Sequence, residues 1–116
     1  MPEAGDLDAR LAVIRRAYIA ELPRKITDLN LAWNDAQAND WQPVQVQVLH
    51  RLVHNLAGSG ATFGFSVVSD CARALESALR VLLQPGPTDD VEAARNLLPT
   101  LFKALIASMD EAAKAQ

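Results

Sequence analysis

The sequence has few of the residues that stabilise small extracellular folds, and it has no long apolar run. Its single cysteine, Cys71, excludes an intramolecular disulfide framework and is typical of a reducing compartment. Aromatic residues make up only 5% of the chain, which favours helices over a β-sandwich. No stretch reaches the roughly 20 apolar residues that span a bilayer, and the N-terminus shows no apolar segment of a signal peptide. We therefore expect a cytoplasmic protein without a membrane segment.

An excess of basic residues is also missing. Lys and Arg together number 11 against 14 Asp and Glu, which gives a formal net charge of −3. Proteins that bind nucleic acid normally carry a basic face, so we expect no nucleic-acid partner. With 116 residues, 50% of them hydrophobic and 22% charged, the chain has the size and composition of one globular domain. We expect that domain to cover residues 1–116.

Apolar residues recur at steps of three and four along nearly the whole chain, which is the period of an amphipathic helix. Proline- and glycine-containing breaks divide this pattern. They predict helices over residues 7–22, 26–36, 43–64, 66–82 and 88–109. Pro99 predicts a kink or a short break in the last helix. Because the connections are short, we expect an all-α fold: an antiparallel up-and-down four-helix bundle with an additional N-terminal helix.

The helix that contains His54 has an unusual polar face. At about 100° per residue, His54 projects roughly 150° from the centre of the apolar stripe, so we expect it at the surface. Its neighbours on that face are Ala57, Gly58 and Ala61, which are all small. A glycine inside a helix costs about 1 kcal/mol relative to alanine, and a domain tolerates this where another body approaches closely. The pattern indicates an exposed imidazole with room for a docking partner.

An imidazole suits a nucleophilic role, because one ring nitrogen is usually unprotonated near neutral pH. An acceptor on the other nitrogen fixes the tautomer, and Glu76 on the following helix is our candidate. His50 precedes His54 by four residues, a spacing that also suits a metal ion. No third ligand stands out in the sequence, so metal binding is the weaker hypothesis.

Residues 54–65 read His-Asn-Leu-Ala-Gly-Ser-Gly-Ala-Thr-Phe-Gly-Phe. This segment resembles the phosphoacceptor segment of histidine phosphotransfer (HPt) domains, whose pattern is roughly His-x-hydrophobic-Lys-Gly-small-small. The Thr-Phe-Gly-Phe ending is most similar to the phosphotransfer domain of chemotaxis-type histidine kinases. Residues 71–76 resemble the next helix of the family, and residues 18–23 resemble its early helices.

The resemblance implies that His54 accepts a phosphoryl group from, or donates one to, an aspartate of a receiver domain. The implied partners are a response-regulator receiver domain, a hybrid histidine kinase, or both. The domain would have no kinase activity and no cofactor of its own, because the receiver supplies Mg²⁺. Glu76 would orient the imidazole. We expect a monomer, and a docking surface formed by His50, Arg51, Ala57, Gly58, Ala61 and Arg73.

Ala57 departs from the family pattern, which places a lysine three residues after the histidine. We hypothesise that Arg51 or Arg73 supplies the missing positive charge. The alternative is a phosphorylation-incompetent HPt-like module that docks a receiver or a kinase without carrying phosphate.

Overall fold

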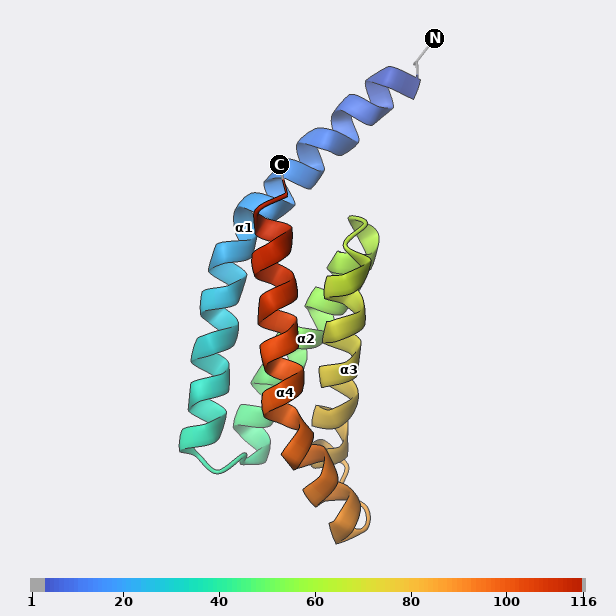
Figure 1. The fold of residues 1–116 in the computed structure, drawn as a ribbon. Coiled ribbons are helices and arrows are strands. Elements are labelled where there is room, and N and C mark those ends of the chain that lie inside the picture. The colour runs from blue at the N-terminus through green and yellow to red at the C-terminus, as the bar shows by residue number, and fades with distance from the viewer. Residues whose placement is uncertain (1–3, 116) are drawn as a thin grey trace.

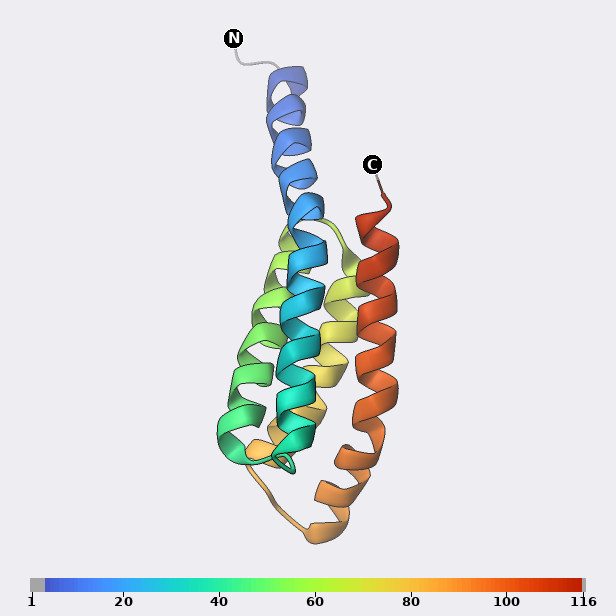
Figure 2. The ribbon, with the colours of Figure 1, turned by 90° about the vertical axis from the view of Figure 1, so that its left-hand side faces the viewer.

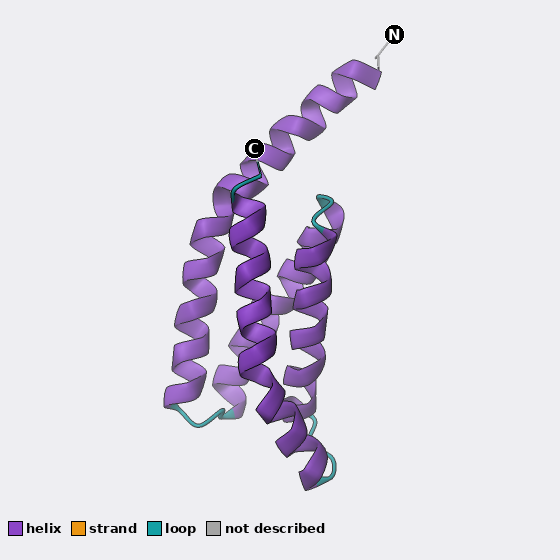
Figure 3. Cartoon of the chain, viewed as in Figure 1, coloured by secondary structure: helices purple, strands orange, loops and turns teal. Residues whose placement is uncertain are grey.

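The computed structural model describes residues 4–115, and its regular elements are all helices (Figure 3). The four helices are α1 (Ala4–Ala38), α2 (Pro43–Thr62), α3 (Ser66–Leu83) and α4 (Thr88–Ala113). Both α1 and α3 pack against α2 and α4. The chain runs up and down through the bundle (Figures 1 and 2), which confirms the predicted all-α fold.

Proline and glycine set the helix ends where the sequence predicts them. Pro43 begins α2, because a proline in the first turn lacks only an N–H that has no helical partner there. Gly64 turns the chain between α2 and α3 with φ +83°, a conformation that strains any residue with a side chain. The Pro-Gly-Pro segment ends before Thr88, the first residue of α4. Short connections therefore keep successive helices adjacent and antiparallel.

The prediction of a separate N-terminal helix is wrong, because α1 continues through Pro23. A proline removes the hydrogen bond to the carbonyl of the fourth residue before it, here Ile19. Leu22 and Leu29 are nonetheless buried on either side of the proline, so packing against the bundle holds the helix together. Figure 1 shows α1 bending where it leaves the bundle. It also shows α4, which contains Pro99, changing direction along its length, as the predicted kink requires.

The N-terminal part of α1 projects past the rest of the bundle (Figures 1 and 2), and we call residues 5–17, which precede the first buried residue of α1, the arm. The apolar period predicts a helix over residues 7–22 whose apolar stripe faces the core. In the structure, the stripe residues Leu7, Leu11 and Ile14 are exposed, and burial begins only at Tyr18. The arm is therefore a continuation of a bundle helix past the end of the core.

Aromatic side chains close the core at both ends. Trp33 of α1 stacks on Phe102 of α4, with ring centroids 4.3 Å apart. At the other end, Tyr18 stacks on Phe63 and Phe65 of the α2–α3 connection, at 4.7 and 5.5 Å. These stacked pairs tie α1 to the rest of the bundle at both ends and leave the face formed by α2 and α3 uncovered.

Within residues 4–115, no helix combines the length and the apolar character that crossing a bilayer requires.

Candidate functional site

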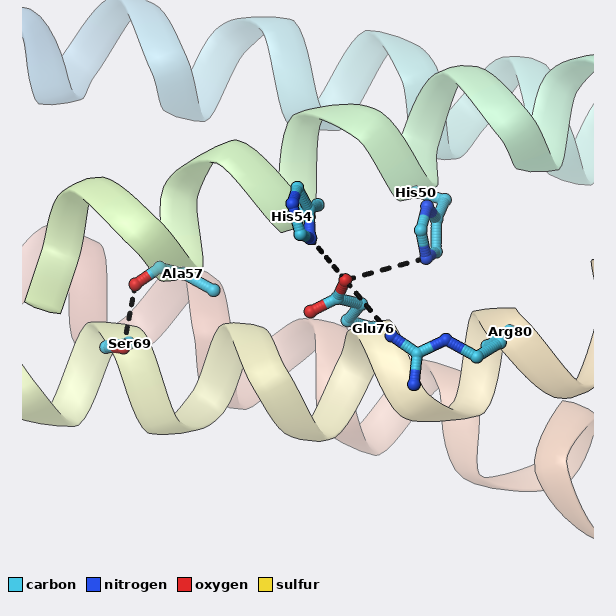
Figure 4. Close-up of polar contacts among 6 residues, drawn as sticks. All are labelled: His50, His54, Ala57, Ser69, Glu76 and Arg80. Atoms are coloured by element: carbon cyan, nitrogen blue, oxygen red, sulfur yellow. Dashed lines mark hydrogen bonds and ion pairs between the residues drawn. The ribbon is translucent and has the colours of Figure 1, made fainter.

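A buried hydrogen bond sets the register of α2 and α3. The Ser69 hydroxyl of α3 donates to the Ala57 carbonyl of α2 at 2.8 Å, and the Ser69 side chain is almost fully buried. Since the two helices are antiparallel, residues before Ala57 in α2 lie opposite residues after Ser69 in α3 (Figure 4). This register brings Glu76, two turns after Ser69, beside the stretch of α2 that carries His50 and His54.

His54 and Glu76 form the central contact of this face. The Nδ1 atom of His54 lies 2.5 Å from Oε2 of Glu76. The His54 side chain is 66% exposed, whereas that of Glu76 is only 10% exposed. A carboxylate only accepts hydrogen bonds, so Nδ1 is the donor to Glu76, and in the neutral imidazole Nε2 is the nitrogen with the lone pair. The arrangement holds the imidazole in the tautomer of a nucleophile.

Arg80 and His50 also lie near Oε2 of Glu76, the oxygen that contacts His54 (Figure 4). Arg80 donates from Nη2 to Oε2 of Glu76 at 3.3 Å, and Nε2 of His50 lies 3.7 Å from that oxygen. Burial lowers the pKa of His50, and this outweighs the opposing effect of the nearby Glu76 carboxylate. At neutral pH, His50 is therefore uncharged, and Arg80 is the cation that contacts the Glu76 carboxylate.

Sequence reasoning missed Arg80, although a signal for it exists. Arg80 follows Glu76 by four residues in α3, and Glu before Arg at this spacing is a favourable pair on one helix face. The pair became recognisable as part of the site only once Glu76 was placed beside His54.

The predicted docking residues divide into exposed and covered ones. Arg51, Gly58, Ala61 and Arg73 are exposed. The prediction of an exposed Ala57 is wrong: the residue is only 4% exposed. The reason is that α3 packs against α2 at this level, where Ser69 donates to the Ala57 carbonyl. The exposure of His50 is intermediate, because its side chain is partly buried.

The two glycines that follow His54 have different surroundings. A Cβ atom added at Gly58 would meet nothing within 4 Å. At Gly60 it would lie 3.2 Å from the backbone nitrogen of Ser69 and 3.3 Å from the carbonyl oxygen of Phe65. Gly60 therefore permits the close approach of α3, whereas nothing inside the described structure requires a glycine at position 58.

The described residues contain no group of three or more His, Cys, Asp or Glu that could hold a metal ion. The rings of His50 and His54 are nearly parallel with centroids 6.2 Å apart, and each presents a nitrogen to Glu76. Only His54 is hydrogen-bonded to the carboxylate, because Nε2 of His50 is buried without a hydrogen-bond partner among the described residues. Cys71 is a partly buried free thiol.

A four-helix bundle that presents a carboxylate-held, exposed histidine has the architecture of a histidine phosphotransfer module. Comparison with protein-family models matches residues 13–113 to the Hpt domain. The match covers most of the chain, so the protein belongs to the Hpt domain family, whose members carry out histidine phosphotransfer in phosphorelays. Searches of curated proteins and of solved structures give no significant match.

Proposed function

We propose that His54 is the phosphoacceptor of this Hpt domain and that it exchanges a phosphoryl group with the aspartate of a response-regulator receiver domain. The observation that carries the proposal is the contact between Nδ1 of His54 and Oε2 of Glu76 on an exposed face. It provides a ring nitrogen with a lone pair, a fixed ring orientation and access for a partner. His50, by comparison, is largely covered by α3 and is the poorer acceptor.

The transfer follows from these positions. The Nε2 lone pair of His54 attacks the phosphorus of an aspartyl phosphate, a P–N bond forms, and the P–O bond to the aspartate breaks. The imidazole gains positive charge while Nδ1 keeps its proton, and the Glu76 carboxylate beside Nδ1 stabilises that charge. The receiver supplies Mg²⁺ for the phosphoryl oxygens, and the reverse reaction uses the same groups.

Hpt domains are phosphocarriers without kinase activity of their own, and we propose the same for this chain. Its partners are then a receiver domain, a hybrid histidine kinase, or both. The cytoplasmic location expected from the sequence stays a prediction.

We further propose that Arg73 supplies the positive charge that the family's lysine would bring. Arg73 lies in α3 between Ser69, which contacts Ala57, and Glu76, which contacts His54, so it lies between the levels of these two α2 residues. A lysine at position 57 would have to extend its chain from a buried site beside α3. An exposed arginine on α3 reaches the same region from the neighbouring helix. Arg51, on the opposite flank of His54, is the second candidate.

A phosphotransfer assay tests the assignment of His54. A phosphorylated receiver domain is incubated with the protein, and acid-labile, base-stable phosphate on the protein is measured. We expect labelling of the wild type, no labelling of His54→Gln, and labelling of the matched control His50→Gln. Phosphate that persists on His54→Gln would refute the proposal.

The replacement of the family's lysine by Ala57 favours a second candidate function, a module that docks a receiver or kinase without carrying phosphate. This candidate predicts receiver binding by the wild type without any transfer. It also predicts that His54→Gln binds the receiver as tightly as the wild type does. Titration of both proteins with an unphosphorylated receiver, alongside the transfer assay, separates the two functions.

A further inference from the structure

The arm carries an apolar stripe that the bundle does not cover. Leu7, Leu11 and Ile14 are 57, 55 and 47% exposed. They follow one another at steps of four and three residues, which is the spacing of a coiled-coil seam. The next step of four leads to Tyr18, the first buried residue of α1. The stripe is thus a continuation of a core seam past the end of the bundle.

The charged residues beside this stripe indicate what covers it. Asp8 and Arg15 lie on one flank, near the tip and the base of the arm, and Arg10 lies on the other flank. When two arms pair antiparallel, like flanks meet, so that Asp8 of each copy faces Arg15 of the other. When they pair parallel, opposite flanks meet, and Arg10 faces Arg15 of the second copy. The charges therefore favour an antiparallel second copy of the same arm.

We propose that this protein forms a two-fold symmetric dimer through its arms, which pair antiparallel. Leu11 of each copy packs against Ile14 of the other, and the two Asp8–Arg15 contacts are related by the same axis. With a two-fold axis, the apolar stripe of each arm is covered by the other arm, and the assembly is closed. The dimer differs from the monomer expected from the sequence.

The end of the bundle has room for the tip of the second arm. An open cavity of about 330 Å³ lies beside the base of the arm, and Phe65 and Val67 are among the residues that line it. The Arg15 guanidinium lies 4.4 Å from the centroid of the Phe65 ring, which fixes its charge at the edge of this cavity. Leu7 of the second copy covers the exposed Val67 in this arrangement, and Asp8 of that copy approaches Arg15.

The proposed dimer leaves the histidine site accessible. The arm projects past the end of the bundle at which α2 and α3 connect (Figures 1 and 2). His54 lies about two helical turns before that end of α2. Dimerisation and phosphotransfer are therefore separate properties, and each can fail without the other.

Sedimentation equilibrium of the full chain, from micromolar to millimolar concentration, tests for the dimer. We expect the mass of the wild type to rise to twice that of the monomer. Leu11→Asp should weaken dimerisation by at least about 100-fold, because the substitution is present twice in a symmetric interface. Val13→Asp is the matched control, since Val13 is 57% exposed on the same arm but lies off the stripe, and it should still dimerise. A monomeric wild type, or equal effects of the two variants, would overturn the proposal.

Disulfide cross-linking tests the orientation, in a Cys71→Ser background. Antiparallel arms place the two copies of position 7 about 16 Å apart along the helix axis, too far for a disulfide. Leu7→Cys should therefore remain uncross-linked on oxidation. An equal mixture of Leu11→Cys and Ile14→Cys should cross-link between unlike chains. Rapid disulfide formation by Leu7→Cys alone would show parallel arms and contradict the proposal.

Phosphotransfer by Leu11→Asp tests the choice of a second copy over another partner. The variant should accept phosphate at the wild-type rate, because Leu11 lies far from His54. A loss of transfer in a folded Leu11→Asp protein would assign the arm to the transfer partner and overturn the dimer. The absence of transfer in the wild type would instead contradict the proposed function and leave the dimer result unaffected.

Discussion

Replacing Gly58 by alanine separates stability from function at the candidate site. Gly58 lies inside α2, on the exposed flank of His54, and an added Cβ would meet nothing within 4 Å. Glycine inside a helix is less stable than alanine by about 0.5–1 kcal/mol. Gly58→Ala should therefore raise the free energy of unfolding by about that amount, measured by urea denaturation.

The same methyl group should slow phosphotransfer. If the receiver approaches this flank closely, the added carbon displaces the partner from the geometry of in-line transfer. A displacement of about 1 Å can cost on the order of 100-fold in rate, so we expect a fall of about 10- to 100-fold. Rapid-quench measurement of transfer from a phosphorylated receiver gives this rate. The expected result is a protein that is more stable and less active than the wild type.

Gly60→Ala, two residues further along α2 at a buried position against α3, is the matched control. Here the added Cβ would lie 3.2–3.4 Å from backbone atoms of Ser69 and Phe65, which cannot move aside as a flexible side chain does. Overpacking of this kind costs about 1–3 kcal/mol and exceeds the helical gain, so Gly60→Ala should be less stable than the wild type. A Gly58→Ala variant that transfers phosphate at the wild-type rate would show that no partner contacts this flank.

Three further predictions concern the polar contacts around His54. Glu76→Gln should slow phosphotransfer by about 10- to 100-fold, the usual cost of losing an orienting partner of an imidazole; an unchanged rate in the transfer assay would remove Glu76 from the mechanism. Because burial lowers the pKa of His50 from its ordinary 6.5, the unfolded chain binds more protons below that pH. The contribution of uncharged His50 to the free energy of unfolding is therefore complete above about pH 6.5, and it is lost as the pH falls through the lowered pKa of His50. Urea midpoints from pH 8 to pH 5 should therefore decline less in His50→Leu than in the wild type. Ser69→Ala should cost about 0.5–1.5 kcal/mol, because it removes the buried hydrogen bond that links α3 to the Ala57 carbonyl, whereas exposed Ser66→Ala should change the urea midpoint little.

The helices were predictable because local residues determine where they end. Pro43 and Gly64 act through their own backbone chemistry, which does not depend on the rest of the fold. Pro23 was misread because its effect does depend on the fold. The cost of one lost hydrogen bond competes with the burial of Leu22 and Leu29, and only the packed bundle decides the outcome.

The site was predictable where one helix determines it and less so where two helices meet. The exposure of His54 follows from its angle to the apolar stripe of α2 alone. The burial of Ala57 depends on where α3 lies, and α2 carries no signal for that position. The placement of Arg80 likewise required the register of the two helices, which a buried serine hydroxyl sets. The exposure of Leu11 depends on where the other three helices stop, which a helical period does not show.

The short connection between α2 and α3 also bears on how the protein folds. His54 and Glu76 are separated by 22 residues and belong to one helical hairpin. Closing so short a loop costs little chain entropy, and pairing of neighbouring helices is among the fast steps of folding. Contacts between α1 and α4 join opposite ends of the chain and carry the larger entropic cost. The histidine and its carboxylate therefore lie in the part of the chain that can assemble first, before its two ends have met.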